Sequence, residues 1–157
     1  MPSTVDLVIP VYNEEDALRP CIEALVSFLA SNLANPWKIT IADNASTDCT
    51  RAVGESLSQE YTTVQYLHLA QKGRGRALRT AWLASDADIL SYMDVDLSTD
   101  IRSYPALIQA IESGCHIAIG SRLSRDSQIT RPLKREVISR GYNALIKVLF
   151  FSSFPDA

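Results

Sequence analysis

Residues 5–15 of the sequence read VDLVIPVYNEE, a short and mostly apolar run that ends abruptly in polar and acidic side chains. A nearly continuous apolar run of this length is typical of a β-strand that is buried on both faces of a sheet. The polar residues that follow, from Tyr12 to Glu15, then stand where the strand reaches the edge of its sheet. The fold class depends on how often this pattern returns.

The pattern returns along the chain, and segments of helical period separate the apolar runs. We predict strands at residues 5–11, 37–43, 63–70, 88–94 and 115–121. We predict helices at residues 14–33, 47–57, 76–84, 103–111 and 133–150. Regular strand-helix alternation predicts an α/β fold with a doubly wound, mostly parallel, Rossmann-like sheet.

Composition limits the class of protein. The chain has 157 residues, 46% of them apolar, and a net charge of −3, which fits a single domain over residues 1–157. The acidic balance argues against nucleic acid as a partner. Three widely spaced cysteines suggest neither a disulfide framework nor a zinc site, and a reducing cytosol is expected. No apolar run approaches the length of a membrane span, so the chain is expected neither to span a membrane nor to be exported.

Asp94 and Asp96 follow the predicted strand 88–94 and are separated by one residue. On an extended backbone two such carboxylates point the same way and can reach one hard divalent cation, Mg²⁺ or Mn²⁺. A cation there could neutralise the diphosphate of a nucleotide sugar. The alternative is an acidic turn that caps the next helix.

Two further strand ends carry groups suited to a nucleoside. Asp43 could accept hydrogen bonds from a base or ribose, and Tyr12 offers an aromatic face beside the carboxylate of Glu14. Glu14 and Glu15 could equally be first-turn residues favoured by a helix dipole.

The segment KGRGR at residues 72–76 combines flexible glycines with three cations and could cradle phosphate charge. It matches neither a P-loop nor a dinucleotide-binding fingerprint. A solvated basic turn is the alternative interpretation.

Taken together, these motifs resemble family 2 glycosyltransferases of the GT-A fold, and most closely the polyprenyl-phosphate (dolichyl-phosphate) mannose and glucose synthases. The motifs that carry the resemblance are VIPVYNEE, ADNASTD, KGRGRALRTA, MDVDLST, GSRL and RPLKREVISRGYNALIKVLF. The family often has an acidic residue followed by Gly or Ser where this sequence has Asn44 and Ala45, which bears on base specificity.

The resemblance implies roles for individual residues. Donor-binding residues would be Pro10, Tyr12, Glu14, Asp43, Lys72, Asp94 and Arg131. Asp94 and Asp96 would serve the metal and the diphosphate, and the catalytic residues would be Asp96, Arg122 and Asp156. Arg122 and Arg131 would contact phosphates, while Asp156 falls where these enzymes carry an acidic residue near the acceptor.

The segment 131–151 mixes basic residues with an apolar stripe. An amphipathic basic helix suits an anionic membrane surface, whereas an ordinary last helix packed on the sheet has the same period. The resembling enzymes continue with acceptor-binding structure, so a chain truncated at its C-terminus is expected, peripheral on the cytoplasmic side of the membrane or tethered by segments outside residues 1–157.

The expected activity is inverting, metal-dependent transfer of mannose or glucose from a UDP- or GDP-hexose to a polyprenyl phosphate. Alternatives are a soluble sugar, protein or polysaccharide acceptor, and a fragment that binds the donor without turnover. A nucleotidyltransferase usually needs a basic, Gly-rich loop after the first strand, and the loop here is acidic.

Overall fold

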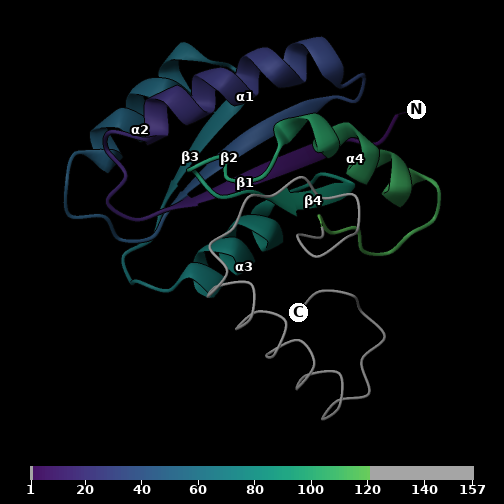
Figure 1. Cartoon of the computed structure of the whole chain (residues 1–157). Helices are drawn as coiled ribbons and strands as arrows, with labels where there is room; N and C mark the ends of the chain where they lie inside the picture. The colour runs from purple at the N-terminus through teal and green to yellow at the C-terminus, as the bar shows by residue number, and fades with distance from the viewer. Residues whose placement is uncertain (1, 121–157) are drawn as a thin grey trace, which may run out of the picture. The chain divides into compact units, whose positions relative to one another are not determined.

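The computed structural model describes residues 2–120, which form four strands and four α-helices with a short 3-10 turn (Figure 1). In chain order the elements are β1 (Val5–Val11), α1 (Leu18–Asn32), β2 (Trp37–Asp43), α2 (Thr50–Glu60), β3 (Val64–His68), α3 (Arg74–Ala84), β4 (Ile89–Tyr92), η1 (Ile101–Ser103) and α4 (Tyr104–Glu112). The strands at residues 5–11, 37–43, 63–70 and 88–94 are confirmed, to within a few residues at their ends.

All pairings between the described strands are parallel, and the strand order is β3-β2-β1-β4. The chain moves outward from β1 through β2 to β3 and then returns to the other side of β1 for β4. The strand order therefore reverses between β1 and β4. In open α/β sheets ligands bind at the carboxyl ends of the strands beside such a reversal.

Helices cover both faces of the sheet, as a doubly wound fold requires (Figure 1). Alternate β1 residues face the two layers, because side chains along a strand point to opposite faces. Leu7 and Ile9 belong to the larger core with α1, α2 and α4. Val8 packs with Ala77 and Ala81 of α3 on the other face. The predicted doubly wound sheet is confirmed.

The first helix begins later than predicted. The apolar pattern predicts a helix that starts at Glu14, but α1 begins at Leu18. A turn precedes α1, and in this turn the Leu18 amide donates to the Glu14 carbonyl over 2.9 Å. Pro20 stands in the first turn of α1, where its missing amide hydrogen removes no intrahelical bond. The glutamates thus lie in a loop at the sheet edge.

The predicted strand at 115–121 is wrong for the part that the structure describes. Residues 115–120 have no strand conformation and take part in none of the pairings. Ile117 and Ile119 are 75% and 54% exposed. A strand needs a neighbouring strand to satisfy its backbone groups, and an alternating apolar pattern alone does not supply one.

The chain divides into two compact units, Met1–Ala118 and Ile119–Ala157. The first contains every element above, and most of the second lies outside the described residues. A single domain over residues 1–157 therefore stays a prediction. Within residues 2–120 no helix has the length and apolarity that crossing a bilayer requires.

Candidate functional site

A cleft of about 400 Å³ opens at the carboxyl ends of β1 and β4, beside the reversal of strand order. It is lined by Pro10, Val11, Tyr12, Glu14, Asn44, Arg74, Asp94, Val95 and Asp96. The β1 end and the loop after it supply an aromatic ring and a carboxylate. The segment after β4 supplies two more carboxylates, and α3 supplies one cation.

The two aspartates after β4 belong to a tight turn. Val95 between them is buried, while both carboxylates border the cleft. The Leu97 amide donates to the Asp94 carbonyl over 3.2 Å, and the Ser98 amide donates to Asp96 Oδ1 over 2.9 Å. Leu97 has a φ of 48°, a left-handed conformation that is unusual for a residue with a side chain. The turn holds the carboxylate pair at the mouth of the cleft.

Two cations from the segment before and at the start of α3 reach this region. Lys72 Nζ lies 3.6 Å from the centroid of the Tyr12 ring, within cation-π range. Arg74 pairs with Asp94 through a guanidinium nitrogen and Oδ1, and its Cζ lies 5.9 Å from the centroid of the Tyr92 ring. The basic segment thus interacts both with the aromatic ring of Tyr12 and with Asp94 of the acidic pair.

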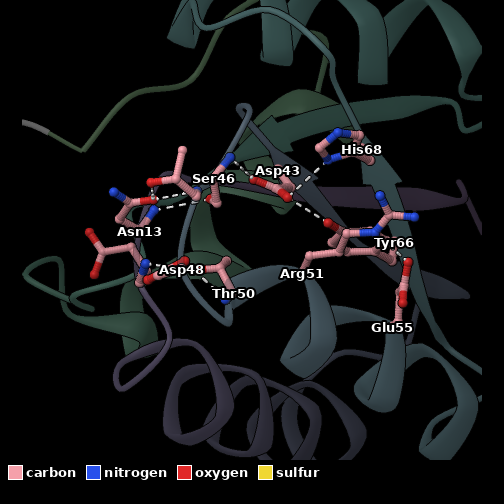
Figure 2. A network of polar contacts seen from close by, with 11 residues as sticks. Asn13, Asp43, Ser46, Asp48, Thr50, Arg51, Glu55, Tyr66 and His68 are labelled. Carbon is pink, nitrogen blue, oxygen red and sulfur yellow. Dashed lines mark hydrogen bonds and ion pairs between the residues drawn. The ribbon is translucent and has the colours of Figure 1, made fainter.

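Asp43 lies at the end of β2, next to the cleft, but does not line it. Its side chain is fully buried and bonded to protein groups on both oxygens (Figure 2). Oδ1 accepts from the Ser46 amide over 2.9 Å, and Oδ2 accepts from the Tyr66 hydroxyl over 2.5 Å and lies 3.1 Å from His68 Nδ1. Burial acts to raise the pKa of Asp43, but these hydrogen bonds outweigh it and lower the pKa.

The buried carboxylate of Asp43 is expected to make the fold sensitive to acid. Because its pKa is lower in the folded chain, its contribution to stability is complete above the pKa of an unfolded aspartate, about 4, and is lost as pH falls through the folded value. The difference in unfolding free energy between the unchanged chain and Asp43→Asn should therefore shrink as pH falls. Urea denaturation from neutral to acidic pH measures it, and a difference independent of pH would contradict the lowered pKa.

Reciprocal hydrogen bonds join the loop after β1 to the loop after β2 (Figure 2). Asn13 Oδ1 accepts from the Thr47 amide over 2.8 Å, and the Asn13 amide donates to Ser46 Oγ over 3.0 Å. The Glu14 amide donates to Thr50 Oγ1 over 2.8 Å. Glu15 Oε2 accepts from the amide of Cys49, also over 2.8 Å. Asn13, Glu14 and Glu15 are thereby held by residues that follow β2.

The structure brings most of the expected site residues to one edge of the sheet. Pro10, Tyr12, Glu14, Asp94 and Asp96 line the cleft, and Lys72 contacts the Tyr12 ring. Asp43 does not line the cleft, and its contact with a nucleoside stays a prediction. Arg122, Arg131 and Asp156, with the segment 131–151, lie outside the described residues.

Among the polar lining residues, the sequence did not single out Asn44 and Arg74 as site residues. Asn44 Oδ1 accepts from the Gly73 amide over 2.5 Å and so fixes the start of α3 beside the β2 end. Asn44 directly follows a buried strand, and this position was the signal in the sequence that could have identified it as a site residue. Arg74 is one of three cations in KGRGR, and spacing alone does not tell which one faces the cleft.

Curated relatives and solved structures match the chain over most of its length. It is 35% identical over 158 residues to the glycosyltransferase AglD of Haloferax volcanii, covering 97% of this chain and 25% of that protein. It is 32% identical over 139 residues to a dolichol-phosphate mannosyltransferase of Pyrococcus furiosus, covering 87% of this chain and 38% of the relative. The chain thus spans well under half the length of these two relatives.

Two solved structures share the fold. The mannosyltransferase PcManGT of Pyrobaculum calidifontis, in complex with GDP-Man and Mn²⁺, aligns with a TM-score of 0.57 at 19% identity, over 71% of this chain and 32% of that one. Glucosyl-3-phosphoglycerate synthase of Mycobacterium tuberculosis aligns with a TM-score of 0.51 at 17% identity, over 91% of this chain and 51% of that one. The fold is therefore the GT-A fold that the sequence predicts.

The family model for glycosyl transferase family 2 matches residues 6–157, which include all of β1 but its first residue, every strand end that borders the cleft and the acidic pair after β4. A match over nearly the whole chain, on a fold with its cleft at the strand-order reversal, settles the membership: the chain belongs to glycosyl transferase family 2.

Proposed function

We propose that the chain carries the donor-binding and catalytic part of an enzyme that transfers a hexose from a nucleoside diphosphate sugar to a polyprenyl phosphate. The observation that carries the proposal is one cleft lined by Tyr12, Glu14, Asp94 and Asp96. Relatives named as dolichol-phosphate and dolichyl-phosphate sugar transferases support the choice of acceptor. The donor is a UDP- or GDP-hexose, since solved neighbours are complexed with GDP-Man or UDP.

Asp94 and Asp96 are the residues proposed to hold Mg²⁺ or Mn²⁺. Both present carboxylate oxygens, the ligands that hard divalent cations prefer, and both border the cleft. Asp94 already attracts a cationic group, the Arg74 guanidinium. Residues 2–120 contain no cluster of three or more His, Cys, Asp or Glu suited to a metal. Oxygens of the donor diphosphate are proposed as further ligands. When bound, the ion supplies positive charge against the leaving diphosphate.

Residues on the β1 side of the cleft are proposed to bind the nucleoside. The ring of Tyr12 offers a stacking face for a base, and Glu14 offers a carboxylate for the hydroxyl or imino hydrogens of ribose or base. Pro10 at the end of β1 contributes an apolar wall. Asp43 is proposed to act through the loop that it fixes, because Ser46 bonds both to Asp43 and to the Asn13 amide.

In the proposed reaction an acceptor phosphate oxygen forms a bond to the anomeric carbon while the bond from that carbon to the donor diphosphate breaks, with inversion. The acceptor oxygen is already anionic, so it needs positioning more than deprotonation. Lys72 places positive charge beside the cleft. We propose Arg122 and Arg131 as further phosphate contacts, Asp156 as an acceptor-side residue, and the basic segment 131–151 as a contact with the cytoplasmic face of a membrane.

Donor binding tests this proposal directly. A saturating UDP- or GDP-hexose with Mn²⁺ is expected to raise the melting temperature, since a ligand at about 100 times its Kd stabilises the native state by about 2.7 kcal/mol. For a chain of this size that corresponds to a shift of roughly 5–10 °C. Without Mn²⁺ the shift should be much smaller. A screen in which no nucleotide sugar gives a metal-dependent shift would exclude the proposed site.

The acceptor is tested separately with a radiolabelled form of the donor selected by that screen. Transfer to a polyprenyl phosphate in detergent or vesicles is the expected result. Transfer only to a soluble sugar or protein would overturn the polyprenyl assignment while leaving the donor site intact.

A further inference from the structure

Arg74 lines the same cleft as the acidic pair and forms an ion pair with one of the two carboxylates, that of Asp94. It is the first residue of α3, and its guanidinium donates a hydrogen bond to Asp94 Oδ1. Both side chains stay accessible, at 58% and 43% exposure. Ion pairs as open to solvent as this one are weak. A stronger ligand for either partner can therefore separate them.

The start of α3 is unfavourable for cations on its own. A helix carries partial positive charge at its amino end, and cations there destabilise it. Yet the first turn of α3 contains no acidic residue, and Lys72, Arg74 and Arg76 all gather around it. Such an arrangement is stabilised when anionic groups face it from outside the helix. Asp94 is one such group, and a diphosphate in the same cleft would be a stronger one.

The backbone that carries Arg74 is fixed, so the side chain can change partners without movement of the loop. The Gly73 amide donates to Asn44 Oδ1 over 2.5 Å, which ties this backbone to the end of β2. The Ala77 amide donates to the Gly73 carbonyl over 2.9 Å and closes the first helical turn. A long arginine side chain on a fixed backbone can reach different acceptors within one cleft by rotation alone.

We propose that Arg74 is a donor-binding residue that exchanges partners. It pairs with Asp94 until a divalent cation takes that carboxylate, and then pairs with the diphosphate of the donor. The cation and Arg74 compete for the same oxygen, whereas the diphosphate attracts both. This inference rests on the proposed function, because it assumes that Asp94 is a ligand of the cation.

The exchange predicts effects of opposite sign from one substitution. Arg74→Met should bind Mn²⁺ alone about three- to tenfold more tightly, because a competing positive charge beside the dication is removed. With saturating Mn²⁺, the same variant should bind GDP or UDP about tenfold or more weakly, because a charged hydrogen bond to the diphosphate is lost. Arg74→Lys should keep the Mn²⁺ affinity near that of the unchanged chain.

The experiment is an electron paramagnetic resonance titration of free Mn²⁺, followed by calorimetric titration of GDP and UDP at saturating Mn²⁺. The matched control is Arg79→Met, which removes an equal charge from an exposed position of the same helix. Asp94→Asn reports on the proposed metal site itself. Thermal melts confirm that each variant is folded.

The outcomes separate the two ideas. If Arg74→Met and Arg79→Met have equal Mn²⁺ affinity, or if Arg74→Met weakens both Mn²⁺ and nucleotide binding, the exchange is refuted while the metal site stands. If the unchanged chain binds no Mn²⁺, or if Asp94→Asn binds it equally well, the proposed metal site fails and the exchange fails with it. Tighter Mn²⁺ together with weaker nucleotide binding, seen only in Arg74→Met, supports the exchange.

Discussion

Asp94→Asn is expected to lower the rate of sugar transfer by about 100- to 1,000-fold, because it removes charge from the group proposed to fix the cation against the leaving diphosphate. Donor binding should also lose its dependence on Mn²⁺. The change is isosteric and the side chain is 43% exposed, so the fold should tolerate it. Initial rates of transfer and calorimetric binding with and without Mn²⁺ measure the two effects.

Asp86→Asn is the matched control for this substitution. Asp86 is 95% exposed, and its carboxylate accepts from Lys38 Nζ over 2.8 Å, away from the cleft. The variant carries the same change of charge and should transfer sugar at nearly the normal rate. Full activity of Asp94→Asn in the presence of Mn²⁺ would remove Asp94 from the metal site.

Gly54→Ala is expected to destabilise the fold by about 1–3 kcal/mol, although alanine normally favours a helix. A Cβ at position 54 would lie 2.4 Å from Cδ2 and 2.6 Å from Cε2 of the Tyr66 ring. The ring cannot move aside freely, because its hydroxyl is bonded to the buried carboxylate of Asp43. Chemical denaturation gives the change in unfolding free energy. The melting temperature should fall by roughly 2–4 °C for each kcal/mol of stability that is lost.

Gly75→Ala is the matched control, and this same substitution is expected to stabilise the fold. Gly75 lies in the first turn of α3, and a Cβ there would meet nothing within 4 Å. This variant should be more stable by up to about 1 kcal/mol, since alanine loses less backbone entropy in a helix than glycine. If both variants were equally stable, close packing of α2 on Tyr66 would not be what requires glycine at position 54.

The sequence predicted those features of the fold and site that depend on the local pattern of apolar and polar residues. Four strands were predicted to within a few residues, because the strands of a parallel sheet read as short, mostly apolar runs. The acidic pair, Tyr12 and Glu14 were predicted at one edge, because the carboxyl ends of parallel strands meet there. These inferences need only the order of elements and the residue that follows each strand.

What the sequence missed depends on contacts between distant residues. The start of α1 was misplaced because the Glu14 amide bonds to Thr50 Oγ1, 36 residues away. The hydrogen-bond partners of the buried Asp43 carboxylate include Tyr66 and His68, which lie 23 and 25 residues further along the chain. The apolar run at 115–120 was taken for a strand because a periodic pattern does not reveal whether a neighbour is available to pair with it. The sequence does not tell which of the three basic residues of KGRGR faces the cleft, because that depends on where α3 begins and how it is oriented on the sheet.

The paired loops after β1 and β2 also bear on how this cleft could be re-engineered. Each loop supplies acceptors for backbone amides of the other, as the bonds from Thr47 to Asn13 and from Glu14 to Thr50 illustrate. A chimera that takes only one loop from a relative would leave such amides without their acceptors, at a cost of about 1–3 kcal/mol for each that becomes buried and unsatisfied. Residues 12–15 and 46–50 are therefore the smallest unit that can be grafted intact, and altered nucleotide preference should be sought by exchanging both segments together.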